Sequence, residues 1–295
     1  MKKTVVVDAP AKINLALDIT GRRADGYHFV DMVMQSVSLR DTVTITRTHT
    51  EGIYISCDRP RIPGGESNLA HIAARRFLEW FGLPKCGLTI DLQKRIPMQA
   101  GMGGGSADAA GVLVGMNALF EVDAPLEELC KLGIGLGADV PFCLAGGTQR
   151  VQGIGERMSA LPNLPDCHIL VAKPEESIPT QECYQRYDQL AEPGRADIAG
   201  MVEALENQSL RQAAQKLSNV LEPAAGLEVV EKLRQRMLAG GALGARMTGS
   251  GSAVYGLFES KWLAKRCMHK LFDLADGAFL MRPLNGGPFI LSERE

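Results

Sequence analysis

The order of apolar and polar residues over the first third of the chain predicts β-strands. Valine, isoleucine and threonine gather in short runs, and residues 42–46 (TVTIT) alternate apolar with polar side chains. That alternation is typical of a half-buried strand. Residues 21–28 (GRRADGYH) form a polar, glycine-containing connection between two of the runs. The predicted strands span residues 4–7, 13–19, 32–39, 42–46 and 53–57.

Helical spacing first appears at residues 66–81 (ESNLAHIAARRFLEWF). Leu69, Ile72 and Phe77 are spaced to lie on one face of a helix, which Gly82 and Pro84 then end. The same reasoning gives the remaining elements. They are helices at 106–120, 126–132, 181–190, 197–205, 209–217, 226–238 and 260–273, and strands at 87–93, 148–153, 168–172, 243–247, 253–258 and 278–282.

A proline-containing segment divides the chain near its middle. Residues 161–166 (LPNLPD) are the best linker candidate, and the order of elements changes after them. A length of 295 residues suits about two domains at roughly 150 residues each. We therefore predict an α+β protein with domains at 1–160 and 161–295. The polar residues 291–295 have the composition of a disordered tail, and we assign them no role.

Composition narrows the class of protein. Hydrophobic residues make up 45% of the chain and charged residues 22%, which is ordinary for a globular protein and excludes a disordered one. A net charge of −2 argues against a broad nucleic-acid-binding surface. No apolar run approaches about 18 residues, so no membrane span is expected. Seven scattered cysteines without a C-x-x-C pair favour reduced thiols, and we predict a cytoplasmic protein.

The strongest chemical signal is the glycine-rich segment 97–110 (PMQAGMGGGSADAA), which runs into a predicted helix. Clustered glycines let the backbone approach a ligand, and the first N–H groups of a helix favour an anion. The segment therefore predicts a phosphate site. Ser106 would cap the helix or help to hold a phosphate-bound Mg²⁺; the alternative is a flexible loop with Ser106 only as a cap. The segment does not fit the Walker A pattern.

Three further motifs are ambiguous when each is taken alone. Lys12 and Asn14 lie two apart at the start of a strand, hence on one face, which is either a site or a solvated surface. Asp139 lies among small and apolar residues, where a carboxylate is paired or functional, or merely ends a helix. Residues 247–252 (MTGSGS) either wrap an anionic group or make a tight turn.

Taken together, these motifs resemble the GHMP kinase superfamily of small-molecule kinases. Within it the chain is most similar to the kinases of 4-diphosphocytidyl-2-C-methyl-D-erythritol, which belong to the non-mevalonate route to isoprenoid precursors. The resemblance implies two α+β domains with a deep cleft between them, the N-terminal one of the ribosomal-protein-like type. The strings that carry it are PAKINL (10–15), GRRADGYH (21–28), GMGGGSADAA (101–110), GADVPF (137–142), GGTQRVQGIGE (146–156), SIPT (177–180) and MTGSGSAV (247–254).

The resemblance also implies a reaction and residue roles. ATP, with Mg²⁺, would donate its γ-phosphoryl group to the 2-hydroxyl of the cytidyl diphosphate substrate. Asp139 would accept the hydroxyl proton, and Lys12 would keep Asp139 ionised and offset developing negative charge. Residues near ATP would be Asn68, Lys94, Pro97, Met98, Gln99, Ala100, Gly101, Met102, Gly103, Gly104, Gly105, Ser106 and Ala107. Residues on the substrate side would be Asn14, Tyr27, His28, Thr180 and Tyr184.

On the substrate side, Tyr27 and Tyr184 would stack on the cytosine ring while His28 reads its polar edge. Some relatives carry Phe where Tyr184 stands, and many carry a second Ser where Ala107 stands. No Glu obviously matches the metal ligand of some superfamily members, so the metal ligands stay unassigned. We expect a monomer or weak homodimer. Two other functions remain open: a GHMP kinase of another alcohol such as homoserine, and a nucleotide-binding regulator without turnover.

Overall fold

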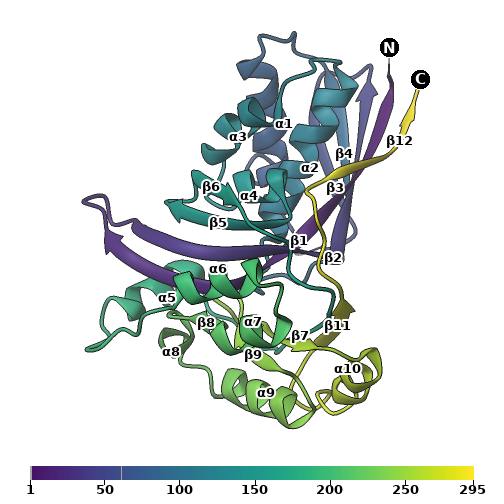
Figure 1. Ribbon diagram of the computed structural model, residues 1–295. Helices are drawn as coiled ribbons and strands as arrows, with labels where there is room; N and C mark the ends of the chain where they lie inside the picture. Colours follow the sequence, from purple (N-terminus) through teal and green to yellow (C-terminus); the bar gives the residue numbers. More distant parts are fainter. Residues whose placement is uncertain (1, 61) are drawn as a thin grey trace.

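Two long antiparallel strands, β1 (Thr4–Arg22) and β2 (His28–Thr48), run through the middle of the molecule (Figure 1). The structure is a computed structural model and describes residues 2–60 and 62–295. The sequence pattern predicted two short strands in place of each long one. β1 continues because its pairing shifts register between Pro10 and Ala11, where a proline without an N–H can be accommodated.

The central part of β1 is buried on both faces, which explains its nearly continuous run of apolar residues. Helix α2 (Gly104–Leu119) packs on β1 from one side, and α6 (Ile198–Glu206) contacts it from the other (Figure 1). Lys12 and Asn14 lie on this central part of β1 and are therefore buried as well.

Among the described residues, the larger sheet has eight strands. Its main path is β12-β1-β2-β4-β3, while β5 and β6 continue from β2, and β8 pairs with β1. Helices α1 to α4 gather over this sheet in the upper half of Figure 1. The remaining bounds are β3 (Gly52–Cys57), β4 (Gly87–Gln93), β5 (Thr148–Gly153), β6 (Arg157–Ala160), β8 (Ser218–Asn219), β12 (Phe289–Arg294), α1 (Leu69–Trp80), α3 (Leu126–Ile134) and α4 (Val140–Ala145).

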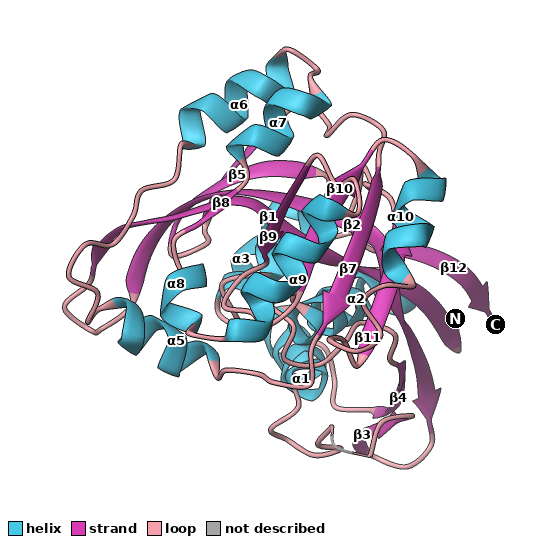
Figure 2. Ribbon diagram, turned by 90° about the horizontal axis from the view of Figure 1, so that it is seen from below, coloured by secondary structure: helices cyan, strands magenta, loops and turns pink. Residues whose placement is uncertain are grey.

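The smaller sheet is antiparallel, with the order β11-β7-β10-β9. Helices α9 and α10 pack against it, as the view from below shows (Figure 2). Its strands and the helices around it are β7 (His168–Lys173), β9 (Gly244–Met247), β10 (Val254–Phe258), β11 (Gly277–Met281), α5 (Thr180–Tyr187), α7 (Leu210–Lys216), α8 (Glu222–Ala225), α9 (Glu228–Ala239) and α10 (Lys261–Met268).

The chain crosses between the two sheets more than once. The predicted linker 161–166 lies between β6 and β7, but the later strands β8 and β12 both pair with β1 in the larger sheet. The division into 1–160 and 161–295 therefore stays a prediction. The prediction of a disordered tail is wrong, because residues up to Arg294 form β12 along the edge of β1.

The start of α1 is set by a side chain rather than by apolar spacing. Asn68 Oδ1 accepts a hydrogen bond from the N–H of Ala70, which caps the helix and moves its start from the predicted residue 66 to Leu69. Along the described chain, none of the helices has the length and apolarity that a membrane span requires.

Candidate active site

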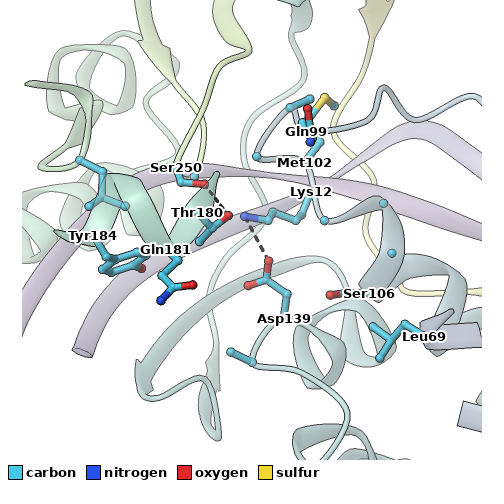
Figure 3. A pocket seen from close by; sticks show the side chains of 18 of the residues that line it. Lys12, Leu69, Gln99, Met102, Ser106, Asp139, Thr180, Gln181, Tyr184 and Ser250 are labelled. Carbon is cyan, nitrogen blue, oxygen red and sulfur yellow. Dashed lines mark hydrogen bonds and ion pairs between the residues drawn. The ribbon is translucent and has the colours of Figure 1, made fainter. Parts of the chain in front are cut away.

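A cavity of about 1170 Å³ joins the glycine-rich segment to the far ends of β1 and β2. Side chains from both halves of the sequence line it, including those of α5 and of the turn after β9 (Figure 3). Of the predicted site residues, Ala107 alone does not line the cavity, because it is fully buried in the core. The others that line it are Lys12, Asn14, Tyr27, His28, Asn68, Lys94, residues 97–106, Asp139, Thr180 and Tyr184.

Hydrogen bonds from distant parts of the chain hold the backbone of the glycine-rich segment in place. The Lys12 N–H donates to the Met102 carbonyl at 3.1 Å, and the Ser252 N–H donates to the Gln99 carbonyl at 3.3 Å. The Thr248 hydroxyl donates to the Gly101 carbonyl, also at 3.3 Å. The segment is therefore a braced loop, unlike the flexible one considered from the sequence.

Glycine is required at one point of this loop by direct approach of backbone to backbone. Gly101 has φ of +70°, and a Cβ added there would lie 2.0 Å from the carbonyl oxygen of Thr248. A side chain at this position would push the loop away from the turn that supports it.

The start of α2 faces the cavity without a side-chain cap. Gly103 occupies the N-cap position with φ of +72°, so the prediction that Ser106 caps the helix is wrong. The Ser106 hydroxyl has no hydrogen-bond partner among the described residues, and a Cβ added at Gly105 would meet nothing within 4 Å. The first N–H groups of α2 are consequently free to bind an anion.

Lys12 and Asp139 meet at the centre of the cavity (Figure 3). Lys12 Nζ lies 3.4 Å from Asp139 Oδ2 and donates to Asn14 Oδ1 at 2.9 Å. Lys12 is 4% exposed, whereas the Asp139 side chain is 31% exposed, so the carboxylate is the member that solvent or a ligand can reach. Asp139 precedes α4 but does not cap it with its side chain, which leaves both oxygens for other partners.

The turn at residues 248–252 and the strand that follows it support the Lys12–Asp139 pair through Asn14, which accepts a hydrogen bond from Lys12. Thr248 Oγ1 accepts the Asn14 N–H at 3.1 Å, and the Tyr255 hydroxyl donates to the Asn14 carbonyl at 2.8 Å. Asn219 donates to two backbone carbonyls at the turn, each at 2.8 Å. Sequence reasoning identified the turn but missed Tyr255 and Asn219, because their partners lie on distant strands.

Lys94 is enclosed by carboxylates next to the glycine-rich loop. Its ammonium contacts Asp41 and Asp108 and lies 3.4 Å from the Gly104 carbonyl oxygen. Desolvation opposes the charge on Lys94, yet the two carboxylates raise its pKa overall. Burial raises the pKa of Asp108 to about 7, since Lys94 offsets only part of the penalty and Asp41 adds to it. Asp108 Oδ1 has no partner within the described chain.

The opposite end of the cavity is aromatic. The rings of His28 and Tyr184 have their centroids 4.9 Å apart, and Tyr27 is 67% exposed at the rim. Burial raises the pKa of the Tyr184 phenol, which stays protonated at neutral pH. Thr180 Oγ1 lies 2.9 Å from Ser250 Oγ (Figure 3). Sequence reasoning missed Asp188, which also lines this end and contacts His28.

Comparison with known proteins places this geometry in a family. The model of the GHMP kinases N terminal domain matches residues 68–147, and that of the GHMP kinases C terminal domain matches residues 201–274. A 4-diphosphocytidyl-2-C-methyl-D-erythritol kinase of Lachnoclostridium phytofermentans is 42% identical over 90% of this chain and 92% of its own. The chain belongs to this family of GHMP kinases.

A second relative and a solved structure carry the same kinase name. A kinase of the same name from Caldicellulosiruptor bescii is 41% identical over 89% of this chain and 92% of its own. The crystal structure of a 4-(cytidine 5'-diphospho)-2C-methyl-D-erythritol kinase superposes with a TM-score of 0.79 at 35% identity, covering 96% of this chain and all of that one. A homoserine kinase from Cytophaga hutchinsonii has a TM-score of 0.78 at 22% identity, covering 99% and 98%, and shares the GHMP kinase fold.

Proposed function

We propose that the protein transfers the γ-phosphoryl group of ATP to the 2-hydroxyl of 4-diphosphocytidyl-2-C-methyl-D-erythritol. The observation that carries the proposal is the Lys12–Asp139 pair, placed between a braced anion-binding loop and an aromatic pocket. With ATP bound at the loop and the cytosine ring bound in the aromatic pocket, the 2-hydroxyl of the substrate would lie between them, beside the Asp139 carboxylate. The names of relatives at 41–42% identity support the same substrate and a place in isoprenoid precursor synthesis.

The loop at 97–106 suits the phosphates of ATP. Its N–H groups at the start of α2 carry partial positive charge, and Gly105, where an added Cβ would meet open space, keeps a side chain out of their way. We place Asn68 and Lys94 near the nucleotide as well. Lys94 would act chiefly through the loop, because its ammonium already contacts Asp41, Asp108 and the Gly104 carbonyl.

The residues present fit Mg²⁺ held largely by the phosphates. Mg²⁺ usually binds through substrate phosphates and water with only one or two protein ligands. No cluster of three or more His, Cys, Asp or Glu side chains that suits a metal occurs in residues 2–60 and 62–295, while the Ser106 hydroxyl faces the cavity without a partner. Ser106 and water would complete the coordination, and the bound ion would neutralise phosphate charge.

Asp139 and Lys12 would perform the proton transfer. The 2-hydroxyl oxygen attacks the γ-phosphorus, its proton passes to Asp139, and the bond to the β,γ-bridging oxygen breaks to release ADP. Lys12 stabilises the ionised carboxylate beforehand and offsets the negative charge that develops. Asn14 positions Lys12 through the 2.9 Å hydrogen bond to its ammonium. Most of the rate enhancement would come from this placement and charge.

The aromatic end suits the cytosine ring. Tyr184 offers a ring face inside the cavity, and Tyr27 at the rim would close over the other face. His28 contributes hydrogen bonding at the edge, and Thr180 lies between the base pocket and the catalytic pair. We expect the protein to act in the cytoplasm as a monomer or weak homodimer.

The release of ADP from Mg·ATP tests this function. The protein is assayed with the cytidyl substrate, with its uridine counterpart, with homoserine and with no acceptor. Release with the cytidyl compound alone supports the proposal. Release with homoserine would favour a homoserine kinase, whose fold this chain shares. Release with none of the acceptors would favour a nucleotide-binding regulator instead.

A further inference from the structure

The imidazole of His28 is held in one orientation at the aromatic end of the cavity. Its ring lies 4.9 Å from that of Tyr184 and meets Tyr187 edge-on, with centroids 6.4 Å apart. The side chain is only 8% exposed. A ring confined in this way can offer a ligand just one part of its edge.

Asp188, at the end of α5, holds one nitrogen of this ring. His28 Nε2 lies 2.7 Å from Asp188 Oδ1, and the second oxygen of the same carboxylate lies 3.1 Å from an Arg22 nitrogen. A carboxylate only accepts hydrogen bonds, so Nε2 must carry the hydrogen. In a neutral imidazole the other nitrogen, Nδ1, is then a bare acceptor.

Nδ1 is available for a ligand. It has no hydrogen-bond partner among the described residues, and it is not one of their buried unsatisfied atoms, so it remains in contact with solvent. His28 itself lines the cavity, as does Asp188. The cavity therefore presents a hydrogen-bond acceptor of fixed position between aromatic rings.

We propose that Asp188 is a positioning residue that fixes the His28 tautomer and thereby selects cytosine over uracil. This inference rests on the proposed function. Cytosine carries an amino group at ring position 4, which can donate to the bare Nδ1, whereas uracil carries a carbonyl there, whose lone pairs would face those of Nδ1. A buried site built for a donor rejects an analogue that lacks it, because the acceptor is left unpaired.

Exchange of Asp188 for asparagine tests the inference through base selectivity. In Asp188→Asn the amide can donate to Nε2, which admits the other tautomer, with a hydrogen on Nδ1. We expect kcat/KM for the uridine substrate to rise, and the cytidyl-to-uridyl ratio of kcat/KM to fall at least about tenfold. Asp188→Glu retains a carboxylate and should restore much of the ratio.

Arg22→Gln is the matched control. It removes the other ion-pair partner of the Asp188 carboxylate and leaves the contact between Asp188 and His28 in place, so the ratio should stay within about twofold of wild type. A purely structural role for Asp188 predicts instead that Asp188→Asn lowers both kcat/KM values together and leaves their ratio unchanged. That result would overturn the inference while the kinase activity of the wild type stands.

The tautomer can also be observed directly in the wild-type protein. Nitrogen-15 spectra of the imidazole rings, with the His28 signals identified by their loss in His28→Gln, should show an unprotonated Nδ1 and a protonated Nε2 in the neutral form of the ring. The opposite tautomer would overturn the inference even if Asp188→Asn failed to fold. A wild type that turned over neither nucleotide would defeat the proposed function, and the selectivity inference with it.

Discussion

Lys12 Nζ lies 3.4 Å from Asp139 Oδ2, although Lys12 belongs to β1 of the larger sheet and Asp139 precedes α4, far along the chain. The ammonium is buried and the carboxylate is partly open to the cavity. This asymmetry lets the lysine stabilise a charge that a substrate can still approach. The rest of the site is arranged to keep the two groups in that relationship.

The Thr248 hydroxyl links three parts of the site, and its loss should destabilise the protein. Thr248→Val removes the acceptor for the buried Asn14 N–H and the donor to the Gly101 carbonyl. An unpaired buried N–H costs about 1–3 kcal/mol. The free energy of unfolding in urea should fall by that amount, while Thr248→Ser, which keeps the hydroxyl, should lose less. Equal unfolding curves for Thr248→Val and wild type would rule out this linking role.

Tyr184 should contribute to binding of the cytidyl substrate through its ring. We expect Tyr184→Ala to raise the Kd of that substrate by an amount that corresponds to about 1–3 kcal/mol of binding free energy, the usual loss when base stacking is removed. Tyr184→Phe keeps the ring face and should bind nearly as tightly as wild type. Isothermal titration calorimetry in the absence of ATP measures both. An unchanged Kd in Tyr184→Ala would exclude the stacking arrangement.

Asp108 should make stability fall as pH rises. Its pKa is raised by burial from 3.8 to about 7. Between these two pH values Asp108 keeps its proton in the folded state and loses it in the unfolded state. The stabilising contribution is complete below about pH 4 and is lost as pH rises toward 7. The free energy of unfolding of the wild type, relative to Asp108→Asn, should therefore decrease over that range.

Urea denaturation at a series of pH values checks this prediction. The exposed Asp123 supplies a control, because Asp123→Asn changes the same chemical group without burial. Wild type and Asp123→Asn should show the same slope with pH, and Asp108→Asn a shallower decline. Parallel curves for all three would mean that Asp108 ionises equally in the folded and unfolded states.

Local patterns predicted the parts of the site that a short string can encode. The glycine-rich segment leads directly into α2, and Lys12 and Asn14 share one face of β1, as their spacing indicated. These features depend on residues close together in sequence. The start of α1 was also within reach, because Asn68 is a strong N-cap residue, but apolar spacing took precedence over it.

Contacts between distant segments could not be predicted in this way. Nothing near His28 indicates that Asp188 is its partner, since α5 brings that residue from the other half of the chain. The resemblance placed Lys94 near the nucleotide, but nothing in the sequence indicated that Asp41 and Asp108 lie beside its ammonium. The strand β12 was missed because residues 291–295 were interpreted as a polar tail, whereas the strand is ordered by its pairing with β1.

Single-turnover transfer of labelled γ-phosphate to the cytidyl substrate, in wild type and Asp139→Asn, tests the central claim most directly. Both proteins should fold alike and bind ATP with similar Kd, because Asp139 caps no helix with its side chain. The account predicts that Asp139→Asn transfers phosphate about 10²–10⁴-fold more slowly, as expected for loss of a general base. Transfer at the wild-type rate in Asp139→Asn would contradict it.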